Sequence, residues 1–180
     1  MMKIAYTMAH GRGELDLLLS DLAARLEERG LTARGIVQTN TECGSYHGCD
    51  MDVRVLPDGP IIRISQNLGK EAKGCRLDPD AMASAVTAVG HSMQADFDVF
   101  LLNKFGKQEA EGRGFRDLLA EALEKGATVI AGTNPLNAEV FEEFAGGMAT
   151  NVPADIDALL TWYERVNEGG GVSAPPRLRP

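Results

Sequence analysis

Short apolar runs alternate with segments of helical periodicity along most of the chain, and this order constrains the fold more than any single motif. The runs predicted as strands are Lys3–Thr7, Thr32–Thr39, Asp98–Asn103, Thr128–Thr133 and Met148–Val152. Helices are predicted between and after them at Glu14–Arg29, Pro79–Ala95, Leu118–Lys125, Asn134–Ala145 and Asp155–Val166. Strand–helix–strand repeats of this length build parallel sheets covered by helices. We therefore expect an α/β fold with three layers and a mostly parallel sheet.

A β-hairpin interrupts this alternation. The turn signal Pro57-Asp58-Gly59-Pro60 separates two strand-like runs, Met51–Leu56 and Ile61–Ser65. We predict a single α/β domain over residues 1–166 with this hairpin as an insertion. Residues 167–180 contain three consecutive glycines and three prolines, so they are predicted to form a disordered tail.

Composition excludes several classes of protein. The net charge of −8 argues against general nucleic-acid binding, which needs a basic face. No segment approaches the roughly 20 apolar residues of a membrane span, and the first residues lack the apolar run of a signal peptide. Three cysteines without a signal peptide indicate reduced thiols. We expect a cytoplasmic protein, and the sequence leaves open whether it forms a homo-oligomer.

Cations are concentrated in two glycine-containing loops of this acidic chain. Arg63–Arg76 has four cations against one carboxylate, and Lys104–Arg116 has four against two. Glycines let backbone N–H groups approach an anion, so a local anion pocket is predicted; the alternative is that these charges are simply solvated. Glu109 and Glu111 are expected to form ion pairs with Lys107 or Arg113; the alternative is that they act as a general base or as metal ligands. The predicted anion- or phosphate-binding residues are Gly11, Arg12, Gly13, Lys70, Lys104, Lys107 and Arg113.

Loops 11–13, 69–75 and 104–113 are expected to converge at one edge of the sheet, because ligands of open α/β sheets bind beyond the carboxyl ends of strands. The first of them stands between a strand and a helix, as phosphate-binding loops do. Glu14 and Leu15 follow it where the G-x-x-x-x-G-K-[ST] pattern needs Lys and Ser or Thr. A carboxylate there repels phosphate, and leucine cannot bind magnesium. This loop is therefore predicted not to serve an ordinary ATPase.

Five runs of residues carry a resemblance to a known family. They are Cys49-Asp50-Met51-Asp52, Ile64-Ser65-Gln66-Asn67-Leu68-Gly69, Gly74-Cys75-Arg76-Leu77-Asp78, the stretch from Asn103 to Gly114, and Phe144-Ala145-Gly146-Gly147. Together they resemble a bacterial family, the domain of unknown function 2478, which is often associated with molybdate-transport genes. The resemblance covers about Lys3 to Trp162.

The order of elements is also similar to that of small P-loop nucleoside triphosphatases, and this implies a P-loop-NTPase-like fold. Those proteins have a metal-binding acid and a Gly-Lys pair after the equivalent strand. This chain has Asn103 at the position of the acid and keeps Gly106-Lys107. Ordinary nucleotide hydrolysis is not expected, because both the lysine of the phosphate loop and this acid are missing.

The cysteines allow a metal site. Cys43, His47 and Cys49 lie in one loop and Cys75 in another, and these four ligands could form a tetrahedral zinc or iron site if the loops converge. The spacing C-x3-H-x-C is not among the common zinc patterns. Free cysteines are also often buried for packing alone. Near the cationic loops their thiols would instead be reactive, because a nearby cation lowers a thiol pKa.

These observations predict a small oxyanion-binding protein with a degenerate phosphate loop. Molybdate is favoured by the gene association of the resembled family, and sulfate or phosphate suits backbone amides and Lys or Arg equally well. The first alternative is a nucleotide-binding protein or nucleoside triphosphatase that uses Arg12, Lys104 and Lys107. The second is a partner-binding protein with a vestigial site. A nucleotide site needs a pocket for the base, whereas an oxyanion site does not.

Overall fold

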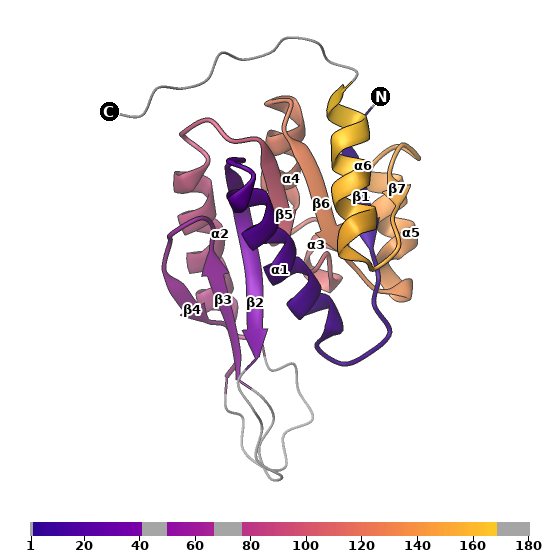
Figure 1. Cartoon of the computed structure of the whole chain (residues 1–180). Helices are drawn as coiled ribbons and strands as arrows, with labels where there is room; N and C mark the ends of the chain where they lie inside the picture. The colour runs from indigo at the N-terminus through magenta and orange to yellow at the C-terminus, as the bar shows by residue number, and fades with distance from the viewer. Residues whose placement is uncertain (1, 41–49, 67–76, 169–180) are drawn as a thin grey trace, which may run out of the picture.

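The computed structural model describes residues 2–40, 50–66 and 77–168. Within these ranges, seven strands form one sheet with helices on both faces (Figure 1), which confirms the predicted three-layer α/β architecture. The strands are β1 Ile4–Thr7, β2 Ala33–Asn40, β3 Met51–Val55, β4 Ile61–Arg63, β5 Val99–Leu102, β6 Thr128–Gly132 and β7 Thr150–Asn151. The helices are α1 Glu14–Glu28, α2 Pro79–Ser92, α3 Lys107–Ala110, α4 Arg116–Glu124, α5 Pro135–Phe144 and α6 Ile156–Glu168.

The strand order is β4-β3-β2-β5-β6-β1-β7. Five of these strands, β1, β2, β5, β6 and β7, are parallel to one another. Strand β3 is antiparallel to both of its neighbours, which makes β3 and β4 the predicted hairpin insertion. The carboxyl ends of the parallel strands share one edge of the sheet, hereafter the carboxyl edge. In Figure 1 this is the lower end, toward which the arrow of β2 points.

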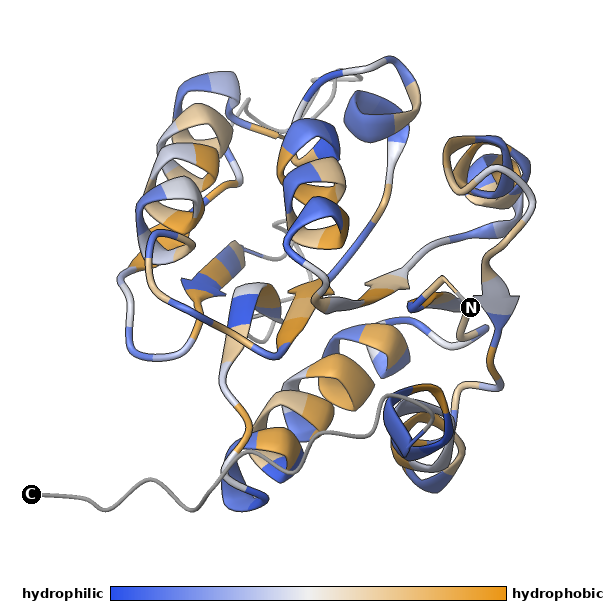
Figure 2. Ribbon diagram, turned by 90° about the horizontal axis from the view of Figure 1, so that it is seen from above, coloured by the Kyte–Doolittle hydropathy of each residue, from blue (hydrophilic) through white to orange (hydrophobic). Residues whose placement is uncertain are grey.

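Two apolar cores lie on opposite faces of the sheet. On one face α1 and α6 pack through buried residues that include Leu22 and Trp162. On the other face α2, α4 and α5 pack through buried residues that include Val89 and Phe141. Figure 2 shows apolar residues gathered on the sides of the helices that face the sheet. A sheet covered on both faces needs strands that are apolar throughout, and all four residues of β5 are buried.

Strands β2 and β5 approach each other closely at Gly35. Its φ of 106° disfavours any residue with a side chain, and a Cβ atom there would overlap the carbonyl oxygen of Leu101. The parallel register pairs these two residues directly. Glycine at this position therefore lets the strand that carries the hairpin pack against the strand that precedes the charged loop.

Two segments differ from the prediction. Helix α3 lies within a stretch predicted to be an irregular loop. Helix α6 continues to Glu168, so it includes the first two residues of the predicted tail. Asn167 is anchored there, because its side chain accepts a hydrogen bond from Lys3 and donates one to Thr128. The rest of the predicted tail lies outside the described residues. None of the described helices is both long enough and apolar enough to cross a membrane.

Candidate functional site

Two of the three loops expected to converge lie at the same edge of the sheet. Loop 11–13 follows β1 and loop 104–113 follows β5, and these strands run parallel on either side of β6. Both loops are therefore at the carboxyl edge, as predicted. The third loop, 69–75, lies outside the described residues.

A pocket of about 540 Å³ opens at the carboxyl edge, where the ends of several strands and helices meet. Its volume is within the range of roughly 300–1,000 Å³ that is typical of small-molecule sites. Eight apolar residues line it. Seven of them, hereafter the apolar side, are Ile36, Met51, Val53, Ile64, Leu77, Met82 and Phe115, and the eighth, Leu136, belongs to the first turn of α5. Its polar lining includes Asp16, Gln38, Asn103, Lys104, Lys107, Gln108, Glu109, Asn134 and Asn137.

Apart from Leu136, the apolar and basic lining residues come from different elements on different sides of this pocket. Most of the apolar side comes from β2, β3 and the start of α2, whereas Lys104 and Lys107 follow β5. The first turn of α5, which follows β6, lines the pocket through Asn134 and Asn137. In the strand order, β5 and β6 are on one side of β2 and the hairpin is on the other. We call Lys104, Lys107 and this helix turn the cationic side.

The cations of the cationic side are open to solvent. Lys104 is exposed and has no ion-pair or hydrogen-bond partner among the described residues. The side chain of Lys107 is 85% exposed, and its Nζ atom lies 3.8 Å from Oε1 of Glu111. The amino end of α5 adds partial positive charge, because helix dipoles point their positive end toward the first turn. An anion at this end of the pocket would meet two lysines and a helix amino terminus, while the carboxylates of Asp16 and Glu109 also belong to the lining.

A buried carboxylate, Glu109, holds the loop that carries these lysines. Glu109 is 3% exposed, and its side chain accepts hydrogen bonds from the N–H groups of Gly106 at 3.0 Å and Phe115 at 3.1 Å. Burial raises the pKa of Glu109, and the two backbone hydrogen bonds oppose that rise. The predicted ion pair of Glu109 is therefore wrong, because backbone N–H groups satisfy its carboxylate. Glu111 does form the predicted pairs, with Lys107 and Arg113.

Asn103 connects three elements at the base of the pocket. It follows β5 and is 2% exposed. Its Oδ1 atom accepts a hydrogen bond from the N–H of Gln38 in β2 at 2.9 Å, and its Nδ2 atom donates to Asp16 of α1 at 2.7 Å. The amide therefore fastens α1 and β2 to β5. A metal-binding acid would instead need an oxygen directed to an ion, so this side chain has a structural role.

In the turn between β1 and α1, a carboxylate of the protein itself pairs with the backbone. The carboxylate of Glu14 accepts a hydrogen bond from the N–H of Gly11 at 2.9 Å. A Cβ atom on Gly11 would overlap that carboxylate, so glycine is what allows the approach. The amide that would face a phosphate group is thus already paired with a negative charge. This geometry gives a structural basis for the prediction that the loop does not serve an ordinary ATPase.

The predicted anion-binding residues do not form one group. Lys104 and Lys107 line the pocket together, whereas Gly11, Arg12 and Gly13 are in the first turn, outside its described lining. Arg113 is likewise not part of that lining and pairs with Glu111. Lys70 and the four predicted metal ligands, Cys43, His47, Cys49 and Cys75, lie outside the described residues. Within the described ranges no group of three His, Cys, Asp or Glu residues is arranged to hold a metal ion.

Several lining residues were not identified from the sequence as site residues. Asn134 was predicted only as the start of a short helix, yet Asn134-Pro135 directly follows a buried parallel strand. That position marks a helix amino terminus at the carboxyl edge and could have pointed to the site. The apolar side had no comparable signal, because residues such as Val53 and Met82 carry the same pattern as ordinary core.

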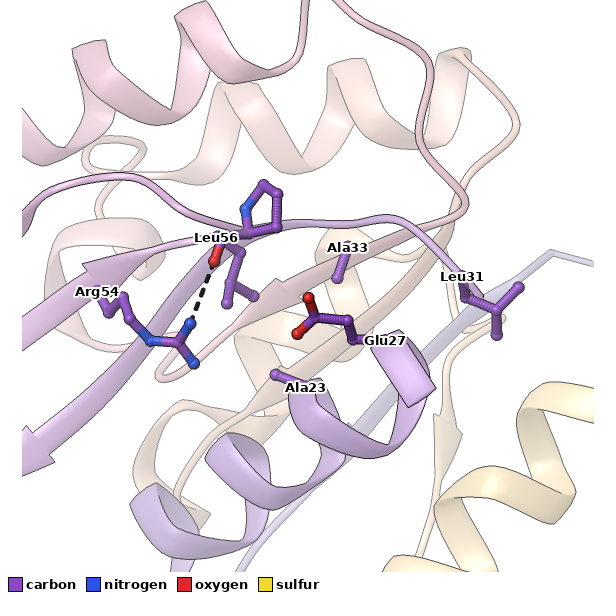
Figure 3. Close-up of a pocket in the computed structure, with 7 residues that line it drawn as sticks. Ala23, Glu27, Leu31, Ala33, Arg54 and Leu56 are labelled. Atoms are coloured by element: carbon purple, nitrogen blue, oxygen red, sulfur yellow. Dashed lines mark hydrogen bonds between the residues drawn. The ribbon is translucent and has the colours of Figure 1, made fainter. Parts of the chain in front are cut away.

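At the opposite edge of the sheet a second hollow is too small for a ligand. It lies between the end of α1 and the beginning of β2, beside Leu56 (Figure 3). Arg54 borders it and donates a hydrogen bond to the carbonyl of Pro57. The volume is about 30 Å³, which is about the space of one water molecule. The carboxyl edge therefore remains the candidate site.

A family model described as "Protein of unknown function (DUF2478)" matches residues 4–162. The chain belongs to this family. A relative of this DUF2478 chain in Bradyrhizobium diazoefficiens, named "Molybdenum import ATP-binding protein ModC 2", is 36% identical over 163 residues. That match covers 89% of the chain and 18% of the relative, so the chain spans less than a fifth of the relative's length. No solved structure matches the chain.

The family membership confirms the resemblance read from the five sequence runs. The seven-stranded, mostly parallel sheet with helices on both faces is a P-loop-NTPase-like fold. This DUF2478 member combines that fold with a first turn occupied by Glu14 and with Asn103 after β5.

Proposed function

We propose that this protein binds a small organic anion of nucleotide size in the pocket at the carboxyl edge. The observation that carries the proposal is the division of that pocket into an apolar side and a cationic side. Lys104, Lys107 and the first turn of α5 suit a phosphate or similar group. The apolar side offers a surface on which the uncharged part of a ligand would be removed from water.

The size of the pocket supports an organic anion more than a free oxyanion. A tetrahedral oxyanion is only a few atoms across and would fill a small part of about 540 Å³. It would also leave Met51, Leu77 and Met82, the partly exposed residues of the apolar side, in contact with water. Molybdate nevertheless remains the second candidate, because a relative that is 36% identical is named as a molybdenum import protein. The same name includes ATP binding, which supports the nucleotide class.

Hydrolysis is not part of the proposal. Transfer of a phosphoryl group depends on a lysine and a magnesium ion to stabilise the developing charge. In this chain Glu14 pairs with the amide of Gly11 where the lysine would act, and Asn103 is bonded to Asp16. We therefore propose binding without turnover at this site.

Calorimetry can test the proposal with ATP, AMP, molybdate, tungstate, sulfate and phosphate as separate ligands. Replacing Lys104 or Lys107 with Ala is expected to weaken anion binding by about 1–2 kcal/mol, or roughly five- to thirtyfold, because a charge-assisted contact is lost. Two control variants remove one cation elsewhere. Arg113→Ala removes a cation from the same loop but outside the described pocket lining. Arg25→Ala removes one from the last turn of α1.

The outcomes separate the candidates. Binding of nucleotides that both lysine variants weaken and both arginine variants retain would support the proposal. Binding of molybdate alone would replace it with the second candidate. If no ligand binds the wild type at millimolar concentration, the pocket is not an anion site, and the protein binds a partner instead.

A further inference from the structure

A second pocket adjoins the one at the carboxyl edge. It has a volume of about 560 Å³ and lies along the first turns of α2. Three residues, Leu77, Met82 and Gln108, line both pockets. The two pockets therefore adjoin at these residues, and together, hereafter the groove, they extend from the cationic side to the surface of α2.

The two ends of this groove differ in charge. None of the described residues that line the second pocket has a charged side chain. Its apolar lining includes Leu77, Pro79, Met82, Ala83 and Val86. Lys104 and Lys107 both lie in the first pocket. A ligand that filled the whole groove would therefore have its charge at one end and an uncharged, mainly apolar group at the other.

Gln108 stands where the pockets join. It belongs to α3 and is half-buried, and its side-chain amide has no hydrogen-bond partner among the described residues. A glutamine amide both donates and accepts, so it can pair with the ring nitrogens and carbonyls of a heterocycle. Met82 also lines both pockets, and a thioether side chain packs well against the edge of an aromatic ring.

We infer that the ligand is an elongated, phosphorylated aromatic heterocycle that occupies both pockets. Its phosphate lies at Lys104 and Lys107, its ring lies against Met82 and Val86 of α2, and Gln108 pairs with a polar edge of the ring. This inference rests on the proposed function, because it names the chemical class and the orientation of the ligand in that site.

The test uses probes that separate the two ends of such a ligand. AMP and GMP have both a ring and a phosphate, ribose 5-phosphate lacks the ring, and adenosine lacks the phosphate. Calorimetry on the wild type should give clearly tighter binding for AMP or GMP than for ribose 5-phosphate. The variant Ala83→Phe fills the second pocket from an exposed position on α2. Its matched control, Ser84→Phe, places the same side chain at the adjacent exposed position, which is not part of the described pocket lining.

Ala83→Phe should weaken nucleotide binding by about tenfold or more, because a ring kept out of an apolar pocket loses a contribution of that order. It should leave the affinity for ribose 5-phosphate unchanged, and Ser84→Phe should change neither. Gln108→Ala should weaken nucleotides only. Melting temperatures of all variants check that each is folded.

Two results would overturn this inference while leaving the proposed function standing. One is equal affinity of the wild type for nucleotides and ribose 5-phosphate. The other is nucleotide binding that Ala83→Phe does not weaken. If no nucleotide and no sugar phosphate binds the wild type, the proposed function fails, and this inference fails with it.

Discussion

Replacing Glu109 with Ala should destabilise the protein far more than replacing Glu111, the other carboxylate of its loop. Its carboxylate is the acceptor for two backbone N–H groups, those of Gly106 and Phe115, which are nine residues apart. The N–H of Phe115 is buried and that of Gly106 is partly buried. An N–H group left unpaired in such a place costs about 1–3 kcal/mol.

The expected loss of unfolding free energy follows from these two groups. Removing the carboxylate also removes the cost of burying its charge, which offsets part of the loss. We expect Glu109→Ala to lower the free energy of unfolding by about 2–4 kcal/mol. Glu111→Ala is the matched control, since its side chain is 42% exposed and makes only surface ion pairs. It should cost less than about 1 kcal/mol.

Urea unfolding, followed by circular dichroism, measures both variants against the wild type. A common denaturant slope would show that the difference lies in the folded state. A loss for Glu109→Ala no larger than that for Glu111→Ala would refute the argument that the two backbone bonds organise this loop.

The same carboxyl group should make stability depend on pH. Burial raises the pKa of Glu109 in the folded protein, so between the unfolded-state and folded-state pKa values the folded protein binds more protons than the unfolded chain. The free energy of unfolding contributed by this group therefore falls as the pH rises from about 4.3 toward the folded-state pKa. Glu109→Gln cannot titrate and should lack this decline. Urea midpoints measured across that window would contradict the assignment if the two proteins gave parallel curves.

Two further predictions, one substitution and one activity assay, test the polar contacts around the site. Asn103→Asp should lower the free energy of unfolding by about 2 kcal/mol or more at neutral pH, because it sets a buried carboxylate against Asp16. This loss should become smaller in acid, where the carboxylates are protonated. Urea unfolding that shows no loss would contradict the hydrogen bond between Asn103 and Asp16. ATP and GTP turnover should stay at background, because Glu14 occupies the amide of Gly11. Magnesium-dependent phosphate release that Lys107→Ala abolishes would overturn this expectation.

The fold was predictable because its signals are local. Strands buried on both faces are apolar throughout, and a helix such as α1 repeats its leucines at helical spacing. Helix α3 was missed since four residues are too few to show a period. It is stabilised by Glu109, which bonds back to Gly106. Glu109 is buried and Glu111 is exposed, although both are glutamates two residues apart. The difference comes from how the loop packs, and the sequence does not show this.

The candidate site was predictable only on its cationic side. Lys104 and Lys107 stand out because they follow a buried strand, and Glu14 stands out because it replaces a lysine. The apolar side is assembled from β2, β3 and α2, which are far apart along the chain and come together only through the sheet order. Hydrophobic residues in such elements are normally core, so no local pattern marks Met82 as a residue that lines the pocket.

The outermost strands of the sheet limit how the molecule can associate. Strand β4 has three residues and β7 has two, so the rows of unpaired backbone groups at both margins are short. Arg63 of the edge strand β4 forms ion pairs with Asp50 and Asp52, and these charges lie where a strand of another molecule would have to pair. Short and charged margins are a common protection against strand addition and aggregation. A neighbouring copy or partner would therefore meet helices or the carboxyl edge more readily than it would extend the sheet.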